Sequence, residues 1–454
     1  MKLFSFWYRR PKGVDSETYR RQRESMEEEA GGSLKPGGSG ASCGIPDALS
    51  FDRIVNGGTC PPLAVRDFMN YLVYVEHAAE NLQFYLWYKD YEKRFAEAKA
   101  TNDNDALAPE WTQAMEDEAV ARVRKDQADK MRREPAVAVA AAIFKGTEFD
   151  KQPGDKKSDP FNTPPLSANG VSDGGSLAAW WEAANSGGAS NNHSASGSGS
   201  RAPAAEAFRS IGARIPFTIQ PFHQEVNRVI TSYIMEGAPR QLNLAAWELR
   251  ATVQALSYTT HPSAFRILFK SVESALRLQS HPNFIRWSIC NGNLARVWFA
   301  RFLGMGLILA GFVIAVVLTL SKAGRGYRVL PLVAWVLGTS TLVAAYKGMC
   351  VVLHGFHHRH VRPWELFTQD DGEESGLASM KSFGSNNSYE DEPWVVRYQD
   401  RSVIHKIFDR EIWIQEPALR QIQDIIFCQA LLAGIAFGLT FMGIFLAIPG
   451  GRFF

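Results

Sequence analysis

The chain has 454 residues, with 49 Lys and Arg against 47 Asp and Glu and a formal net charge of +2. This balance gives no reason to expect nucleic-acid binding along the whole chain. The five cysteines are scattered and form no C-x-x-C pair, which speaks against a disulfide framework or a cysteine zinc site and suits a reducing cytosol.

Residues 1–50 are predicted to form a flexible tail. Basic patches at 9–12 and 20–23 and an acidic patch at 27–29 precede the glycine-rich GGSLKPGGSG. The aromatic and basic start could lie on an anionic membrane leaflet, but a solvated tail is the favoured interpretation. The apolar stretch in this start is too short for a signal peptide, and no small-residue cleavage site follows it, so we expect the first 300 residues to stay on the cytosolic side.

Two helical blocks follow. Residues 51–95 carry apolar side chains at helical spacing, such as Phe68 and Leu72, and the pattern returns in 211–290 with residues such as Phe269. No alternating strand pattern appears between 51 and 290. We therefore predict an all-helical domain whose two blocks close around one apolar centre that includes Phe68 and Phe269.

Residues 96–210 are predicted to be an insertion that is largely disordered. Its first part, WTQAMEDEAVARVRKDQADKMRRE, can form a charged, solvent-exposed helix with Glu118 and Arg122 four residues apart. The rest is rich in Gly, Ser, Asn and Pro and has too few large apolar residues to offset the entropy of ordering. An insertion of this length is expected to loop out of the fold.

Three apolar runs in the last third predict transmembrane helices at 302–320, 329–346 and 425–448. A helix needs about 17–25 mostly apolar residues to cross a bilayer, and each run meets that length. Lys347 would have to snorkel or mark the membrane edge. Residues 347–424 are predicted to be a cytosolic loop. Charged groups are absent from the spans, which argues against a channel or carrier.

Four histidines follow the second span: His354, His357, His358 and His360. Their number suggests a metal site, but they are mixed with arginines and lie directly beside a span. A basic strip that touches lipid headgroups is the favoured interpretation, so no metal site is assigned. The motifs GxxxxGK[ST] and HExxH are absent, and no cofactor or catalytic residue is expected.

Several stretches resemble the RGS family, the helical bundles that bind heterotrimeric G-protein α subunits. VRDFMNYLVYVEHAAENLQFYLWYKDYEKRF resembles the early helices, with Phe68 on one helix and Glu80, Asn81 and Leu82 on the next. HQEVNRVITSYIMEGAPRQLNLAAWELRATVQAL and AFRILFKSVESALRLQSHPNFIRW are similar to the later helices. With the three spans and the segment EPWVVRYQDRSVIHKIFDREIWI, the chain looks like fungal RGS membrane proteins related to a bud-site-selection protein.

The resemblance implies an RGS-like bundle that is split by the insertion and followed by three transmembrane helices. It implies binding of a Gα subunit and acceleration of its GTP hydrolysis, without a catalytic side chain of its own. Asn81 matches the family residue that contacts the switch regions, and Glu80 lies beside it. A purely structural role for Asn81, as a cap or turn residue, stays open.

Other contact positions depart from the family pattern. Gln254 aligns loosely with a second contact Asn, while Gln279 and Asn283 stand where many active members have Asp and Arg. Loss of the Asp removes a charged hydrogen-bond acceptor. The alternative function is therefore a non-catalytic membrane scaffold or polarity landmark that uses a degenerate RGS domain.

The expected protein is an integral, multi-pass membrane protein whose RGS-like domain lies in the cytosol. Its expected partners are a Gα subunit and the lipid bilayer, and a membrane protein or a second copy of the chain stays open as a further partner. The spacing of Gly434 and Gly438 would permit a helix pair. We expect the loop before the second span and the C-terminal GGRFF on the outer side.

Overall fold

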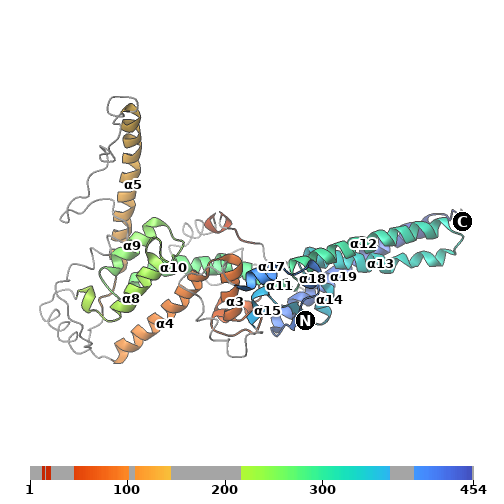
Figure 1. The fold of residues 1–454 in the computed structure, drawn as a ribbon, viewed down its shortest axis with the longest axis horizontal. Helices are drawn as coiled ribbons and strands as arrows, with labels where there is room; N and C mark the ends of the chain where they lie inside the picture. The colour runs from red at the N-terminus through yellow and green to blue at the C-terminus, as the bar shows by residue number, and fades with distance from the viewer. Residues whose placement is uncertain are drawn as a thin grey trace. The chain divides into compact units, whose positions relative to one another are not determined.

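The computed structural model describes residues 13–15, 17–21, 45–101, 108–144, 216–368 and 393–451. Within these ranges the chain is mostly helical, with one small two-stranded sheet (Figure 1). It divides into two compact units: unit 1 combines residues 1–79 with 274–454, and unit 2 is residues 80–273. The division passes through both blocks of the predicted helical domain, residues 51–95 and 211–290.

Unit 2 contains the long helices α4 (Ala79–Thr101) and α5 (Gln113–Phe144) and several short ones. The short ones are η5 (Phe217–Ile219), α8 (His223–Val229), η6 (Ile230–Ile234), α9 (Ala246–Leu256), η7 (Pro262–Phe265) and α10 (Arg266–Ala275). Aromatic rings fill the core: Tyr88 stacks on Phe269 at 4.3 Å, and Phe84 lies 6.2 Å from Phe265. Such pairs stabilise a core by their buried area and by ring geometry.

Polar contacts also join α4 to α8 across the insertion. Arg94 donates two hydrogen bonds to Glu225, at 2.9 and 2.6 Å, and Trp87 donates a third at 2.7 Å. The guanidinium lowers the pKa of the Glu225 carboxyl. Residues on either side of the insertion therefore pack together within unit 2.

The beginning of the insertion is folded in the structure. The helix α5 forms as predicted, and Arg122 bonds Glu118 at 2.8 Å. The prediction of a fully solvent-exposed helix is wrong, because Trp111, Ala119 and Val123 are buried and α5 packs along α9. Small and apolar residues one helical turn apart give this otherwise charged helix one face that can be buried. Residues 145–215, which include most of the predicted disorder, lie outside the described residues.

Unit 1 holds a second aromatic core. Its helices are η2 (Asp47–Leu49), α2 (Phe51–Val55), α3 (Val65–Tyr71), the π-helical turns η3 (Leu72–Glu76) and η8 (Leu276–Ser280), and α11 (His281–Ile289). Phe68 lies 4.9 Å from Phe284, and Tyr71 lies 5.2 Å from Trp287. Phe68 and Phe269 therefore belong to different units. The prediction that both lie in one apolar centre is wrong, because Phe68 packs on Phe284 in unit 1 and Phe269 packs on Tyr88 in unit 2.

Part of the predicted flexible tail is ordered. The backbone of Val14 makes two hydrogen bonds to the side chain of Asn283, and Tyr19 bonds Ser274 at 2.8 Å. Val14 is only 5% exposed. An apolar anchor and paired backbone groups offset the entropy of ordering this short segment.

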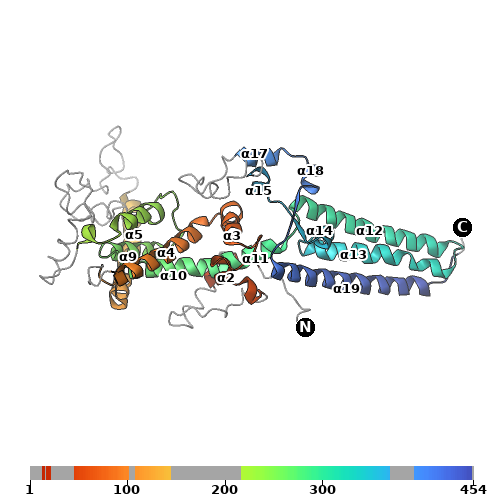
Figure 2. The ribbon, with the colours of Figure 1, turned by 90° about the horizontal axis from the view of Figure 1, so that it is seen from below.

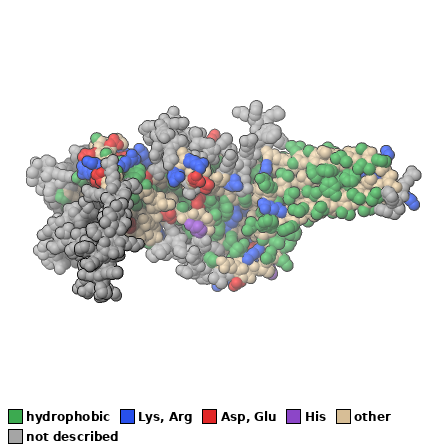
Figure 3. Space-filling model, turned by 90° about the horizontal axis from the view of Figure 1, so that it is seen from above, with side chains coloured by type: hydrophobic (Ala, Val, Ile, Leu, Met, Phe, Trp, Pro, Cys, Tyr) green, Lys and Arg blue, Asp and Glu red, His purple; other side chains and the backbone are tan. Residues whose placement is uncertain are grey.

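Three helices of unit 1 are long and apolar enough to cross a membrane. They are α12 (Leu294–Leu320), the η9 turn (Arg325–Val329) with α13 (Pro331–Tyr346), and α19 (Pro417–Ala447). They lie side by side (Figure 2), and hydrophobic side chains cover the visible face of this bundle (Figure 3). The predicted spans lie almost entirely within these helices. The helices α12 and α19 begin before the predicted spans, because amphipathic turns precede their apolar runs.

Small residues set the packing of this bundle. The α-carbon faces of Gly304 and Gly338 lie against each other, so that a β-carbon on either would clash. Gly434 and Gly438 face α13 in the same way. Glycine permits this close approach between apolar helices. Gly434 and Gly438, whose spacing suggested pairing with another helix, therefore pack against α13 of the same chain.

The predicted cytosolic loop contains folded elements between α13 and α19. They are α14 (Val351–Gly355), β1 (His358–His360), α15 (Pro363–Thr368), α17 (Pro393–Gln399), α18 (Val403–Ile407) and β2 (Glu411–Trp413). The strands β1 and β2 are antiparallel, with Arg359 opposite Ile412. We call the described residues 350–368 and 401–416 the juxtamembrane module.

Candidate partner-binding site

Glu80 and Asn81 lie in the first turn of α4. The preceding π-helical turn η3 ends at His77, whose φ of 56° is left-handed and turns the chain before α4 begins. Both side chains are half-buried. Within the described part of the chain, the Asn81 amide makes no hydrogen bond, so its donor and acceptor are available to a partner.

Gln254 lies near the end of α9 and is also half-buried. Its backbone carbonyl accepts a hydrogen bond from the Ser257 hydroxyl at 2.7 Å. This bond helps to end α9. Gln254 belongs to unit 2 together with Glu80 and Asn81.

Gln279 and Asn283 belong to unit 1. Gln279 lies in the π-helical turn η8 and Asn283 in the first turn of α11. The Asn283 amide donates to the Val14 carbonyl at 2.8 Å and accepts from the Val14 N–H at 2.8 Å. Asn283 therefore holds a segment of its own chain, a role that the sequence analysis missed because Val14 lies in a tail of polar composition.

The five predicted contact residues thus divide between the units. Glu80, Asn81 and Gln254 lie in unit 2, whereas Gln279 and Asn283 lie in unit 1. The Asn81 amide is half-buried and has no hydrogen bond within the described residues, whereas the Asn283 amide is bonded to Val14.

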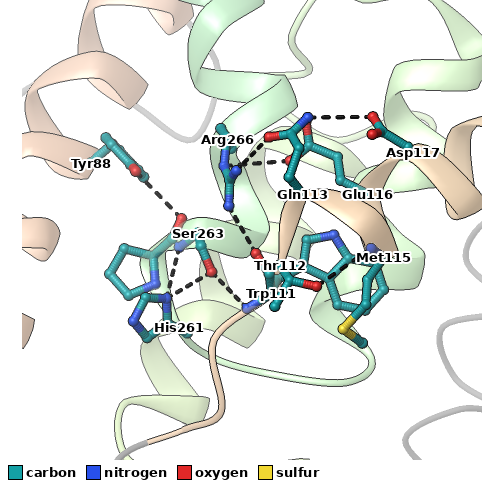
Figure 4. A network of polar contacts seen from close by, with 11 residues as sticks. Tyr88, Trp111, Thr112, Gln113, Met115, Glu116, Asp117, His261, Ser263 and Arg266 are labelled. Carbon is teal, nitrogen blue, oxygen red and sulfur yellow. Dashed lines mark hydrogen bonds and ion pairs between the residues drawn. The ribbon is translucent and has the colours of Figure 1, made fainter.

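A polar network around Arg266 fixes the start of α5 in unit 2 (Figure 4). The guanidinium donates to the Trp111 carbonyl at 2.8 Å and to the Gln113 side chain at 2.7 Å, and it lies 3.4 Å from the Glu116 carboxylate. Burial raises the pKa of Glu116, and the Arg266 charge opposes this rise. The flat, forked guanidinium can serve several acceptors at once.

A serine and a histidine meet in the same network, but their bonds are structural. The Ser263 hydroxyl lies 2.7 Å from Nδ1 of His261 and accepts a hydrogen bond from the Trp111 N–H at 2.8 Å. The same Nδ1 accepts from the Ser263 backbone N–H at 3.1 Å. This pattern is a cap at the start of η7, and burial lowers the pKa of His261.

The basic residues after the second span do not form an exposed strip in the structure. Arg359 is 5% exposed and bonds Glu365 at 2.8 and 3.0 Å, and His360 is 1% exposed. The guanidinium of Arg362 lies 3.6 Å from the ring centre of Trp287. The predicted contact with lipid headgroups is therefore wrong for these residues, because each of them packs inside unit 1.

Arg296 connects α12 to the juxtamembrane module. It donates to Glu411 at 2.7 Å and lies 3.0 Å from Nε2 of His360, which must accept because a guanidinium only donates. Burial, followed by the charge of Arg296, lowers the pKa of His360 to about 4. His360 is therefore neutral at physiological pH.

Comparison of the chain with protein-family models, curated proteins and solved structures finds no match in any of the three.

Proposed function

We propose that this chain is a membrane-anchored regulator of G-protein signalling. It binds a Gα subunit at the cytosolic face and accelerates GTP hydrolysis by holding the switch regions in the geometry of the transition state. The α subunit supplies the reacting groups, so the chain needs no catalytic residue of its own.

The observation that carries this proposal is the state of Asn81. A half-buried side chain in a first helical turn has a fixed direction, and its amide has no hydrogen bond within the described residues. An amide in this state can donate to one backbone group of a partner and accept from another. This is the role that the RGS resemblance gives to Asn81.

The three apolar helices support the membrane anchor. We propose that they cross the bilayer, with the helical units and the juxtamembrane module in the cytosol. Anchoring confines the chain to the surface where lipidated Gα subunits reside, which raises the effective concentration of the two partners. A weak contact surface can then suffice.

Arg328 bears on this orientation. It is 1% exposed and donates to the carbonyls of Phe445 and Ile448 at 3.0 and 2.6 Å, at the end of α19. A cation at a helix C-terminus is stabilised by the orphan carbonyls. The Arg328 charge is therefore stabilised by carbonyl groups inside the bundle. Lys322 and Arg325 are the exposed cations that remain in the first loop. With fewer exposed positive charges, the loop has a weaker preference for the cytosol.

The second candidate function is a non-catalytic membrane scaffold. Asn283, one of the proposed contact residues, uses both groups of its amide to hold Val14. A partner that needed this amide would have to displace the N-terminal segment. In this case the chain would bind Gα, or another membrane protein, without speeding hydrolysis.

Single-turnover GTP hydrolysis separates the two candidates. The full chain is placed in lipid nanodiscs and mixed with candidate Gα subunits that carry GTP. We expect acceleration by the wild type, and about a tenfold loss for Asn81→Ala, since a hydrogen bond lost at a desolvated interface costs on the order of 1.4 kcal/mol.

The control is Asn56→Ala, which changes an exposed asparagine at the end of α2. It should leave the acceleration unchanged. Binding without acceleration would favour the scaffold, and equal acceleration by Asn81→Ala and the wild type would remove Asn81 from the contact surface.

A further inference from the structure

Two imidazoles and a carboxylate from separate segments converge in unit 1. His354 lies near the end of α14, His357 lies two residues beyond it, and Asp424 lies near the beginning of α19. Nε2 of His354 is 3.4 Å and Nδ1 of His357 is 3.9 Å from Oδ1 of Asp424. One ligating atom of each residue lies within 4.8 Å of the other two.

These separations are longer than ordinary hydrogen bonds, which join N and O at about 2.7–3.2 Å. They suit two ligands of one metal ion. With bonds of about 2.0–2.2 Å, neighbouring ligand atoms of a tetrahedral Zn²⁺ lie about 3.3–3.5 Å apart. The pair of His354 and Asp424 already has this spacing, and Nδ1 of His357 lies 3.9 Å from the same carboxylate oxygen.

The backbone directs His357 toward this point. His357 has a φ of 52°, a left-handed conformation that is rare for a residue with a side chain. Its N–H donates to the His354 carbonyl at 2.8 Å, and its own carbonyl accepts from Ile414 at 2.9 Å. The Nδ1 atom that faces Asp424 is buried and has no hydrogen-bond partner in the described part of the chain.

The His354 ring is fixed by packing. Its side chain is 7% exposed and lies 4.9 Å from the ring of Phe427. A neutral imidazole can offer a lone pair to a metal ion. The side chain of Asp424 is half-exposed.

We propose that His354, His357 and Asp424 bind one divalent transition-metal ion of the Zn²⁺ class. Two imidazoles and one carboxylate form a ligand set that Zn²⁺ accepts, whereas Ca²⁺ and Mg²⁺ prefer oxygen ligands alone. Water can fill the fourth position. The ion would join α14, which follows the second apolar helix, to α19, the third, and this inference is independent of the proposed G-protein function.

Metal content tests the site directly. The full chain in detergent is stripped with EDTA, incubated with ZnCl₂, desalted and analysed for zinc. We expect about one ion per chain for the wild type, and at least a tenfold loss of zinc affinity for His354→Ala, His357→Ala and Asp424→Asn. A titration with Co²⁺ should give the visible absorption of a tetrahedral site in the wild type alone.

The control variants are His405→Ala and Asp400→Asn, which change exposed residues of the segment before α19. Both should bind zinc as the wild type does. Asp424→Asn keeps the size of a half-exposed side chain, so its comparison holds even if His354→Ala fails to fold. Equal zinc content in the wild type and in Asp424→Asn would mean an adventitious ion only and would overturn the proposal.

Discussion

His281 lies in the core of unit 1 and is 5% exposed. Its Nε2 is 2.8 Å from the Leu49 carbonyl, and its ring lies 6.0 Å from Phe51. Burial lowers its pKa from 6.5 to about 4. The unfolded chain therefore binds a proton at this residue at pH values where the folded chain does not.

This difference predicts a loss of stability in mild acid. Between pH 6.5 and about 4 the unfolded state alone is protonated at His281, so the free energy of unfolding falls as the pH falls. The full effect is on the order of 3 kcal/mol, at about 1.4 kcal/mol for each pH unit. Thermal unfolding of the full chain in detergent, at pH 7.5 and pH 5.0, measures the part that develops by pH 5.0, which is about 2 kcal/mol.

His281→Gln should reduce the loss on acidification, because glutamine can still donate to the Leu49 carbonyl but does not titrate. His405→Gln changes an exposed histidine and should behave as the wild type. The same drop in midpoint for His281→Gln and the wild type would show that another group controls the acid response.

At the scale of single residues, the sequence indicates which residues can form polar contacts better than it indicates their partners. The RGS resemblance assigns both Asn81 and Asn283 to partner contact. The structure leaves the Asn81 amide without a hydrogen bond within the described residues and joins the Asn283 amide to Val14. No local pattern relates positions 14 and 283, because the pairing depends on the tertiary fold. Asp424 was missed for the same reason.

At the scale of elements, α5 shows how one side chain fixes a helix. The Arg266 guanidinium reaches the Trp111 carbonyl, Gln113 and Glu116, which hold the start of α5 against η7 and α10 (Figure 4). The sequence predicts the helix from its composition and its charge pairs. It does not predict the docking, because the buried stripe is short and lies among charged residues.

Arg266→Lys is expected to loosen α5 without unfolding unit 2. An ammonium cannot bond the Trp111 carbonyl and the Gln113 side chain in the forked geometry of arginine, and the loss should be about 2 kcal/mol. Hydrogen exchange of residues 111–123 should then accelerate by roughly tenfold or more.

The matched control is Arg250→Lys, a change at an exposed arginine on α9. Exchange in α5 should stay at the wild-type rate in this variant. Unchanged exchange in Arg266→Lys would show that the apolar contacts of Trp111 and Val123 are sufficient to hold the helix.

At the scale of the whole molecule, the three apolar helices could be predicted closely because length and hydropathy are local properties. The two compact units could not be predicted from the sequence. The predicted boundary at residue 290 separates the helical domain from the membrane half, whereas the structure joins residues 1–79 and 274–290 with the membrane helices in unit 1. Contacts between residues far apart in the sequence decide this division, and a sequence pattern contains no direct record of them.

The contacts that join these parts of unit 1 are specific. Trp364 of the juxtamembrane module stacks on Tyr74 at 4.7 Å and on Trp287 at 6.1 Å. Gln423 of α19 donates to the Ile289 carbonyl at 3.1 Å. The Cys60 N–H donates to the Glu416 side chain at 2.8 Å.

A fragment of residues 45–290 should therefore lose the stability of its unit 1 portion. It would expose the faces of Tyr74 and Trp287 that pack on Trp364, and it would leave the buried carbonyl of Ile289 without its partner. Hydrogen exchange of residues 65–76 and 281–289 should be at least about tenfold faster in the fragment than in the full chain in nanodiscs.

Residues 84–95 of α4 provide the internal reference, because their partners Phe265, Phe269 and Glu225 all remain in the fragment. Their exchange should be the same in both samples. If residues 281–289 exchanged as slowly in the fragment as in the full chain, the helical part would not depend on the juxtamembrane module. The predicted domain boundary at residue 290 would then mark an independent folding unit.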